Sequence, residues 1–256
     1  MRQTRKLKRK RRRRLKKGVK IFLIGFSVVL AVIMIVMFGF QLQNVKISLD
    51  LGQYTSQEVK AYMDAKEIDN TLMFWLKNKA GHSTRLELLE EYNVKMLSPF
   101  SVKISGYEKK LKGFIVKDGA NYYFDENGTI LKISEDKIKD TPIVDGLDTK
   151  ELKIYEKIKV SDNKQLQSLL DVTSSIEKYN FGVKKIKINE SNEVTILIKK
   201  VQVQLGKTMN LNKKLEALND MYSKVIQQSG ILNMKYASED GSYTLKKTQK
   251  KHTENK

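Results

Sequence analysis

A run of apolar residues near the N-terminus, residues 19–40, constrains this chain more than any other feature of its sequence. Apart from Lys20, the run carries no charged side chain. At about 1.5 Å of rise per residue, some twenty helical residues cross the roughly 30 Å hydrocarbon core of a bilayer. A buried helix of this length in a soluble protein would show a polar stripe, and this run shows none. The run therefore predicts a transmembrane helix.

The residues before this run are strongly basic. The first twenty residues contain no acidic side chain, although the whole chain has 29. Clusters of Lys and Arg stay on the cytoplasmic side of a membrane. The segment Phe38-Gly39-Phe40-Gln41 is a poor signal-peptidase site, so we expect an uncleaved anchor with residues 1–18 in the cytoplasm and the rest outside. The residues expected to set this orientation are Lys10, Arg11, Arg12, Arg13, Arg14, Lys16, Lys17 and Lys20.

A basic run can also bind nucleic acid. This one has no interleaved aromatic residues on which bases would stack, and it adjoins the apolar run. Attraction to anionic lipid is therefore the favoured interpretation, and nucleic acid is not an expected partner.

The first part of the outer region, residues 42–107, predicts a β-α-α-β-β module. Residues 45–49 alternate like a strand, and Thr55 and Glu58 have the spacing of a helix capping box. The apolar cluster at residues 71–76 is interpreted as core. A second helix is expected at residues 84–91, followed by strands at 93–97 and 100–105.

The pattern changes after Gly106 to hairpins and two long helices, which predicts a mixed β domain at residues 108–246. The helices are expected at residues 163–179 and 211–228, where apolar residues recur every three or four positions. Residues 140–147 are expected to form a loop. The expected strands are 113–117, 121–124, 129–133, 185–189, 193–198, 201–205 and a final hairpin of 231–236 with 242–246. The polar residues 247–256 are expected to be disordered.

No group of residues predicts catalysis. His82 and His252 stand alone, there is no cysteine, and no His or carboxylate cluster has metal-ligand spacing. Gly206-Lys207-Thr208 lacks the upstream glycine of a phosphate-binding loop, because position 201 is Val. We therefore expect a non-enzymatic binding protein with no cofactor, metal or small-molecule substrate.

The order of these parts resembles the bacterial FtsQ/DivIB cell-division family. The resemblance covers residues 11–248 and includes two specific stretches, Pro142-Ile143-Val144-Asp145-Gly146-Leu147 and Tyr122-Tyr123-Phe124-Asp125-Glu126-Asn127-Gly128. Val45-Lys46-Ile47 with Tyr54-Thr55-Ser56-Gln57-Glu58 resembles the opening of that family's polypeptide-transport-associated (POTRA) module. The usual Gly-Asn after the first strand is replaced by Asp50-Leu51-Gly52-Gln53, and the usual Pro-Val-Ala by Leu111-Lys112-Gly113. The Lys and Ile usage resembles the Gram-positive DivIB branch.

The resemblance implies a divisome scaffold of the cell membrane, enriched at the septum. Such a protein binds the bitopic proteins FtsL and FtsB/DivIC and helps to control septal cell-wall synthesis. The fold class that it implies is α+β, with one transmembrane helix, a POTRA-like module and a mixed β domain. Three alternatives remain open at this point: an envelope enzyme, a membrane-anchored wall-binding module, and a POTRA-type protein in transport or sporulation.

The last strand is the expected partner site. It precedes the polar tail, so we expect it to lie at a sheet edge, where a partner segment adds as a further strand. The resemblance points to the same edge. An alternative, which is compatible with the first, is that Tyr243 and Leu245 pack on the last helix while Lys246 and Lys247 protect the edge. The residues expected at the site are Tyr236, Gly241, Ser242, Tyr243, Thr244 and Leu245.

Overall fold

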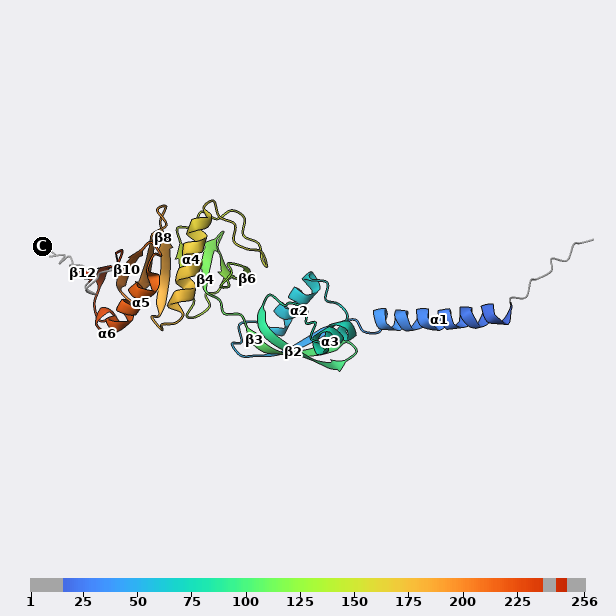
Figure 1. The fold of residues 1–256 in the computed structure, drawn as a ribbon. Coiled ribbons are helices and arrows are strands. Elements are labelled where there is room, and N and C mark those ends of the chain that lie inside the picture. The colour runs from blue at the N-terminus through green and yellow to red at the C-terminus, as the bar shows by residue number, and fades with distance from the viewer. Residues whose placement is uncertain (1–15, 237–242, 248–256) are drawn as a thin grey trace, which may run out of the picture. The chain divides into compact units, whose positions relative to one another are not determined.

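The computed structural model describes residues 16–236 and 243–247. The chain divides into two compact units, residues 1–108 and 109–256. Helices and strands are mixed in both (Figure 1). The predicted α+β fold with an N-terminal apolar helix is thereby confirmed.

The N-terminal helix, α1 (Lys17–Phe38), is apolar around its whole circumference and buries none of its side chains. A helix of this kind is not stable against water, because each turn would expose hydrocarbon on every side. It is long and apolar enough to cross a membrane. The fold is therefore compatible with a single-pass anchor at the N-terminus.

Unit 1 continues as a three-stranded sheet with two helices. Its elements are β1 (Asn44–Leu49), α2 (Ser56–Ala65), α3 (Thr71–Lys79), β2 (Leu89–Ser98) and β3 (Ser101–Glu108). The strand order is β1-β3-β2, with β3 parallel to β1 and antiparallel to β2. Alternate residues of each strand are buried beneath α2 and α3, so the other face of the sheet is open.

Side-chain caps determine where α2 and α3 begin. The Thr55 hydroxyl accepts a hydrogen bond from the Glu58 amide, and the Glu58 carboxylate accepts one from the Thr55 amide. These two bonds confirm the predicted capping box. Asn70 caps α3 in the same manner, because its Oδ1 accepts the amide of Met73 at 2.9 Å.

The helix that follows α2 in unit 1 is α3, and the prediction of a helix at residues 84–91 is wrong. Residues 84–86 belong to no regular element, residues 87–88 form a turn, and β2 begins at Leu89. Side chains hold the backbone of this segment: the Tyr62 hydroxyl accepts a hydrogen bond from the Glu87 amide at 2.9 Å, and the Tyr92 hydroxyl donates to the Thr84 carbonyl. These contacts satisfy backbone groups that a helix would otherwise have paired.

Unit 2 is built on one nine-stranded sheet with the order β12-β11-β10-β9-β8-β7-β4-β5-β6. The strands are β4 (Gly113–Lys117), β5 (Ala120–Phe124), β6 (Ile130–Ser134), β7 (Ile143–Asp145), β8 (Val183–Ile188), β9 (Val194–Ile198), β10 (Val201–Gly206), β11 (Gly230–Asn233) and β12 (Thr244–Lys247). The helices are α4 (Asn163–Ile176), α5 (Leu211–Asp220) and α6 (Tyr222–Val225).

Two crossover connections put the helices on one face of this sheet. The chain runs from β7 through α4 to the parallel neighbour β8, and from β10 through α5 and α6 to the parallel neighbour β11. Both crossovers move the same way along the sheet. Because such connections share one handedness, α4 and α5 lie side by side on the same face (Figure 1). The main core lies between these helices and the sheet.

Two further predictions for unit 2 are wrong. Residues 143–145 are not loop but the central strand β7, paired in parallel with β4 and β8. The single long helix expected at residues 211–228 is divided, because Met221 ends α5 with φ −97° and ψ 1° before the short helix α6. Unit 2 therefore has one long helix, α4, and a shorter one, α5.

Phe74 provides a test of the unit 1 core. Its side chain is only 3% exposed, and its ring stacks on that of Tyr92 at 6.1 Å between centroids. We expect Phe74→Ala to lower the free energy of unfolding by about 3–5 kcal/mol, because it leaves a cavity. Its neighbour Met73 is 46% exposed, so Met73→Ala should change the free energy by no more than about 0.5 kcal/mol. Chemical denaturation of the full chain in detergent measures both, and equal effects would contradict this assignment.

Candidate functional site

β12 is the terminal strand of the nine-stranded sheet, on the opposite edge from β6. It pairs with β11 in an antiparallel ladder in which Leu245 lies opposite Leu232 and Thr244 opposite Asn233. Its other side has no strand neighbour among the described residues. A terminal strand leaves backbone N–H and C=O groups available to a further strand. The last strand therefore has the position that the sequence predicts.

The side chains of β12 divide between the two faces of the sheet. Tyr243 and Leu245 are half-buried and pack against the core on the face that carries the helices. Thr244, Lys246 and Lys247 are exposed. The packing alternative for Tyr243 and Leu245 is thus present, and it leaves the outer backbone row of the strand unpaired within the described chain.

The other residues of the predicted site have different placements. Tyr236, three residues past the end of β11, is 84% exposed. Gly241 and Ser242 lie outside the described residues. The partner-binding role of the set stays a prediction.

A glycine allows β11 and β12 to approach each other. Gly230 has φ +146°, and a Cβ atom at this position would lie 2.1 Å from the carbonyl oxygen of Lys246. Any larger residue would collide with backbone rather than with a flexible side chain. Gly230 is therefore required for the register that places Leu245 opposite Leu232.

A buried lysine ties together the strand ends next to this edge. The Lys214 side chain is 2% exposed, and its Nζ donates to the carbonyls of Leu205 at 2.7 Å, Lys207 at 3.0 Å and Lys235 at 2.9 Å. It thus joins α5, the end of β10 and the segment just after β11. Burial lowers the pKa of the Lys214 ammonium group, and the three carbonyls supply the hydrogen bonds that it loses from water.

Lys214 was not among the residues predicted from the sequence, although one signal was present. Lys214 lies within the apolar stripe of α5, three residues after Leu211 and four before Leu218. A lysine on the buried face of a helix needs acceptors, and carbonyls at two strand ends provide them here. An ion pair adds a second contact to the segment just after β11. The Lys235 ammonium group lies 2.8 Å from the Glu193 carboxylate and lowers the pKa of that carboxyl.

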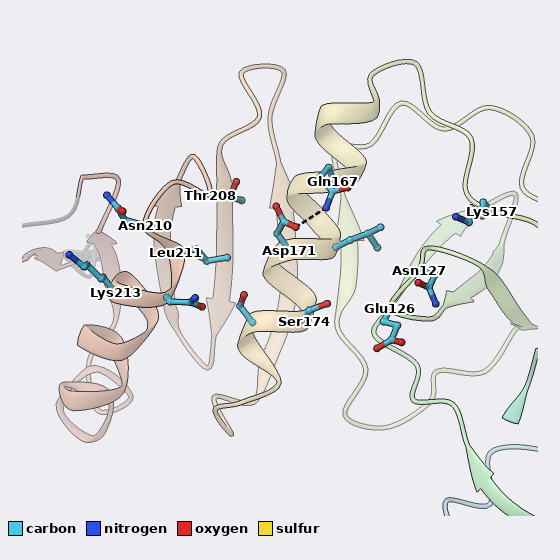
Figure 2. Close-up of a pocket in the computed structure, with 13 residues that line it drawn as sticks. Glu126, Asn127, Lys157, Gln167, Asp171, Ser174, Thr208, Asn210, Leu211 and Lys213 are labelled. Carbon is cyan, nitrogen blue, oxygen red and sulfur yellow. Dashed lines mark hydrogen bonds between the residues drawn. The ribbon is translucent and has the colours of Figure 1, made fainter. Parts of the chain in front are cut away.

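A polar groove of about 760 Å³ lies between α4, the start of α5 and the β5–β6 turn (Figure 2). Amide, hydroxyl and charged side chains line it, and Gln167 donates to Asp171 at 2.8 Å. No group of three His, Cys, Asp or Glu residues in the described ranges has the geometry of a metal site. His82 is exposed on a loop of unit 1.

Three of the eight residues predicted to set the membrane orientation lie at the start of α1. Lys16 directly precedes the helix, and Lys17 and Lys20 fall in its first turn. Lys10, Arg11, Arg12, Arg13 and Arg14 lie outside the described residues. The structure thus describes the end of the basic segment, which leads straight into the apolar helix.

Most of unit 2 matches a known protein family. Residues 114–239 match the family described as FtsQ/DivIB, C-terminal related. The matched range runs from β4 to just beyond β11 and so covers most of unit 2. No curated protein matches the chain. The resemblance to the FtsQ/DivIB family is confirmed, and the chain carries a C-terminal domain related to that family.

The role of Lys214 can be tested by a substitution that keeps the alkyl stem. Lys214→Met leaves three carbonyls without their donor, so we expect it to lower the free energy of unfolding by about 2–3 kcal/mol. Lys213→Met is the matched control, because Lys213 is exposed on the same turn. Thermal and denaturant unfolding of the full chain measure both. An unchanged Lys214→Met variant would show that these hydrogen bonds contribute nothing to stability.

Proposed function

We propose that this chain, with its FtsQ/DivIB-related domain, is a non-enzymatic scaffold of the divisome that binds FtsL-like and FtsB/DivIC-like proteins. The family match over residues 114–239 carries the proposal and supports a role in cell division with protein partners. FtsQ/DivIB is a family of division scaffolds rather than of enzymes. Through such contacts the protein helps to control septal cell-wall synthesis.

The proposed contact is strand addition at β12. A partner segment in extended conformation pairs with the outer backbone row of β12, and these hydrogen bonds supply affinity. Alternate side chains supply specificity, with Tyr243 and Leu245 on one face and Thr244 and Lys246 on the other. Because Tyr243 and Leu245 already pack on the core, the edge is ordered before the partner arrives. An ordered edge lowers the entropic cost of association.

Tyr236 extends this proposed surface. The Tyr236 side chain is 84% exposed, so its ring is available for contact with a partner. Aromatic side chains are enriched among the residues that dominate protein interfaces. We therefore assign Tyr236, together with Gly241 and Ser242, to the partner surface beside β12.

The proposed anchor is α1, with the N-terminus in the cytoplasm and the two units outside the cell at the septum. Lys16, Lys17 and Lys20 continue the basic segment up to the start of the apolar helix, and this charge bias favours a cytoplasmic N-terminus. The basic segment is also proposed to attract anionic lipid.

The two units are proposed to be separate modules. Unit 1 has the element order β-α-α-β-β, which supports a POTRA-like module over residues 42–107. Unit 2 supports the β domain over residues 108–246. The proposed remainder is a cytoplasmic tail, residues 1–18, and a span, residues 19–40. The disordered tail predicted at residues 247–256 cannot begin at Lys247, because Lys247 is the last residue of β12 and lies opposite Gly230.

Strand addition at β12 makes a prediction about binding. We expect Tyr243→Ala to raise the dissociation constant for a DivIC-like partner by about tenfold or more, because truncation of a central aromatic residue typically costs over 1 kcal/mol. Thr244→Pro should weaken binding further, since proline interrupts strand pairing. Ile133→Ala on the opposite edge strand β6 is the matched control, because Ile133 is also exposed. Binding of the purified full chains measures all three, and folded variants with unchanged affinity would place the site elsewhere.

The proposed topology is tested separately. Reporter fusions after Gln41 should be active only outside the cytoplasm, and protease added to wall-free cells should digest both units while sparing the basic segment. This expectation follows from the charge bias before α1. A soluble mature form that begins near Leu42 would contradict it.

A further inference from the structure

Three lysines stand in one row across the open face of the unit 1 sheet. In the strand register, Lys103 of the central strand β3 lies directly opposite Lys46 of β1 on one side and Lys95 of β2 on the other. Adjacent strands are about 4.8 Å apart, so the three stems leave the sheet within a row about 10 Å wide. The face opposite to them is the one that α2 and α3 cover.

This row of three lysines destabilises the unit 1 sheet. Like charges at directly opposed positions of neighbouring strands destabilise a sheet. Within the described ranges, no acidic side chain pairs with any of the three lysines. The next row of the same face carries the uncharged Ser48, Ser105 and Asn93. The acidic residue Glu91 comes two positions beyond Asn93, so it lies well away from the lysine row. An external anion would offset this repulsion.

The row of Lys46, Lys95 and Lys103 lies near one end of the unit 1 sheet, the end at which the chain enters the sheet from α1. β1 begins at Asn44, shortly after α1 ends at Phe38. β3 runs parallel to β1, so the turn between β2 and β3 lies at the same end, where the Phe100 carbonyl accepts the amides of Gln43 at 2.9 Å and Asn44 at 3.0 Å. The lysine row is two residues from these strand ends, or about 7 Å along the strands.

The same end of the sheet exposes apolar side chains. Leu97 and Phe100, in and beside the β2–β3 turn, are 44% and 41% exposed. The start of α3 also lies here, because the Asn70 amide nitrogen donates to the Val36 carbonyl and the Thr71 amide to the Phe40 carbonyl, both at 2.8 Å. Hydrogen bonds thus hold this end of unit 1 to the C-terminal end of the apolar helix.

We propose that this end of unit 1 docks on the membrane surface, with the row of Lys46, Lys95 and Lys103 bound to the phosphate groups of anionic phospholipids. The inference rests on the proposed membrane anchor. Apolar side chains enter the interface of a bilayer, and lysines close behind them reach phosphates with flexible stems. A soluble phosphodiester polymer has the same charge, but the location beside α1 and the exposed Leu97 and Phe100 favour lipid.

Lysine acylation tests this contact residue by residue. The full chain is inserted into nanodiscs of phosphatidylcholine alone or of phosphatidylcholine mixed with phosphatidylglycerol, and mass spectrometry measures the acylation rate at each lysine. We expect phosphatidylglycerol to slow the reaction at the three lysines by about fivefold, and high salt to remove the effect. Lys199 and Lys200 are exposed in unit 2 and serve as controls whose rates should not change.

A double variant tests whether the row acts as one site. In K46Q/K95Q, we expect phosphatidylglycerol to protect Lys103 much less, because one lysine alone holds an anion weakly. The matched variant K199Q/K200Q should keep the full protection of Lys103. Equal acylation rates in the two kinds of nanodisc would overturn the proposal. So would protection by soluble polyglycerol phosphate with none by lipid, which would identify the row as a polymer site.

The test also separates this inference from the proposed anchor. A chain that is absent from the nanodiscs altogether would contradict both the anchor and the docking surface. A chain that is embedded, with its three lysines fully reactive, would contradict only the docking surface.

Discussion

Three residues of β7 hold the two halves of unit 2 together. On one side β7 pairs with β4 of the hairpin half, and on the other with β8 of the half that carries the crossover helices. β7 ends directly before Gly146, whose φ is +88°. A Cβ atom at this position would lie 1.9 Å from the Ile188 carbonyl oxygen, so only glycine fits there. Lys185 lies 2.9 Å from Asp145 and lowers the pKa of that carboxyl, which adds an ion pair across the same junction.

The continuity of the sheet determines where a partner strand can add. With β7 in place, the described strands of unit 2 form one sheet whose two edges are β6 and β12. The parallel crossovers put α4 and α5 on one face, so Tyr243, just before β12, and Leu245 within β12 pack against the core on that face. Because β7 joins the two halves of the sheet, β12 becomes an edge strand. One face of β12 packs against the core, and its outer backbone groups have no strand partner among the described residues. Lys214 and Gly230 then fix the neighbouring strand ends.

Much of this arrangement could be predicted from local sequence signals. The capping box at Thr55 and the apolar periodicity of α4 each act within a few residues, and each is present as predicted. The final hairpin was also predicted, together with the position of β12 at the edge.

The features that sequence missed depend on distant residues. β7 is too short to show alternation, and only its neighbours β4 and β8 make it a strand. Lys214 has acceptors that come from two strand ends outside its helix. The lysine row on unit 1 becomes visible only when the register of β1, β3 and β2 is known, because its members are far apart in the sequence.

The central claim is that β12 is the strand on which a division partner adds. The chain contains no cysteine, so a single introduced cysteine is a unique probe. The most direct measurement is disulfide crosslinking in cells between Lys246→Cys and single cysteines placed along a DivIC-like partner, with Ile133→Cys on β6 as the comparison. The account predicts crosslinks from position 246 to alternate partner residues, as in a paired strand, and none from position 133. Crosslinks from position 133 alone, or from neither position in cells where both proteins are present at the septum, would contradict it.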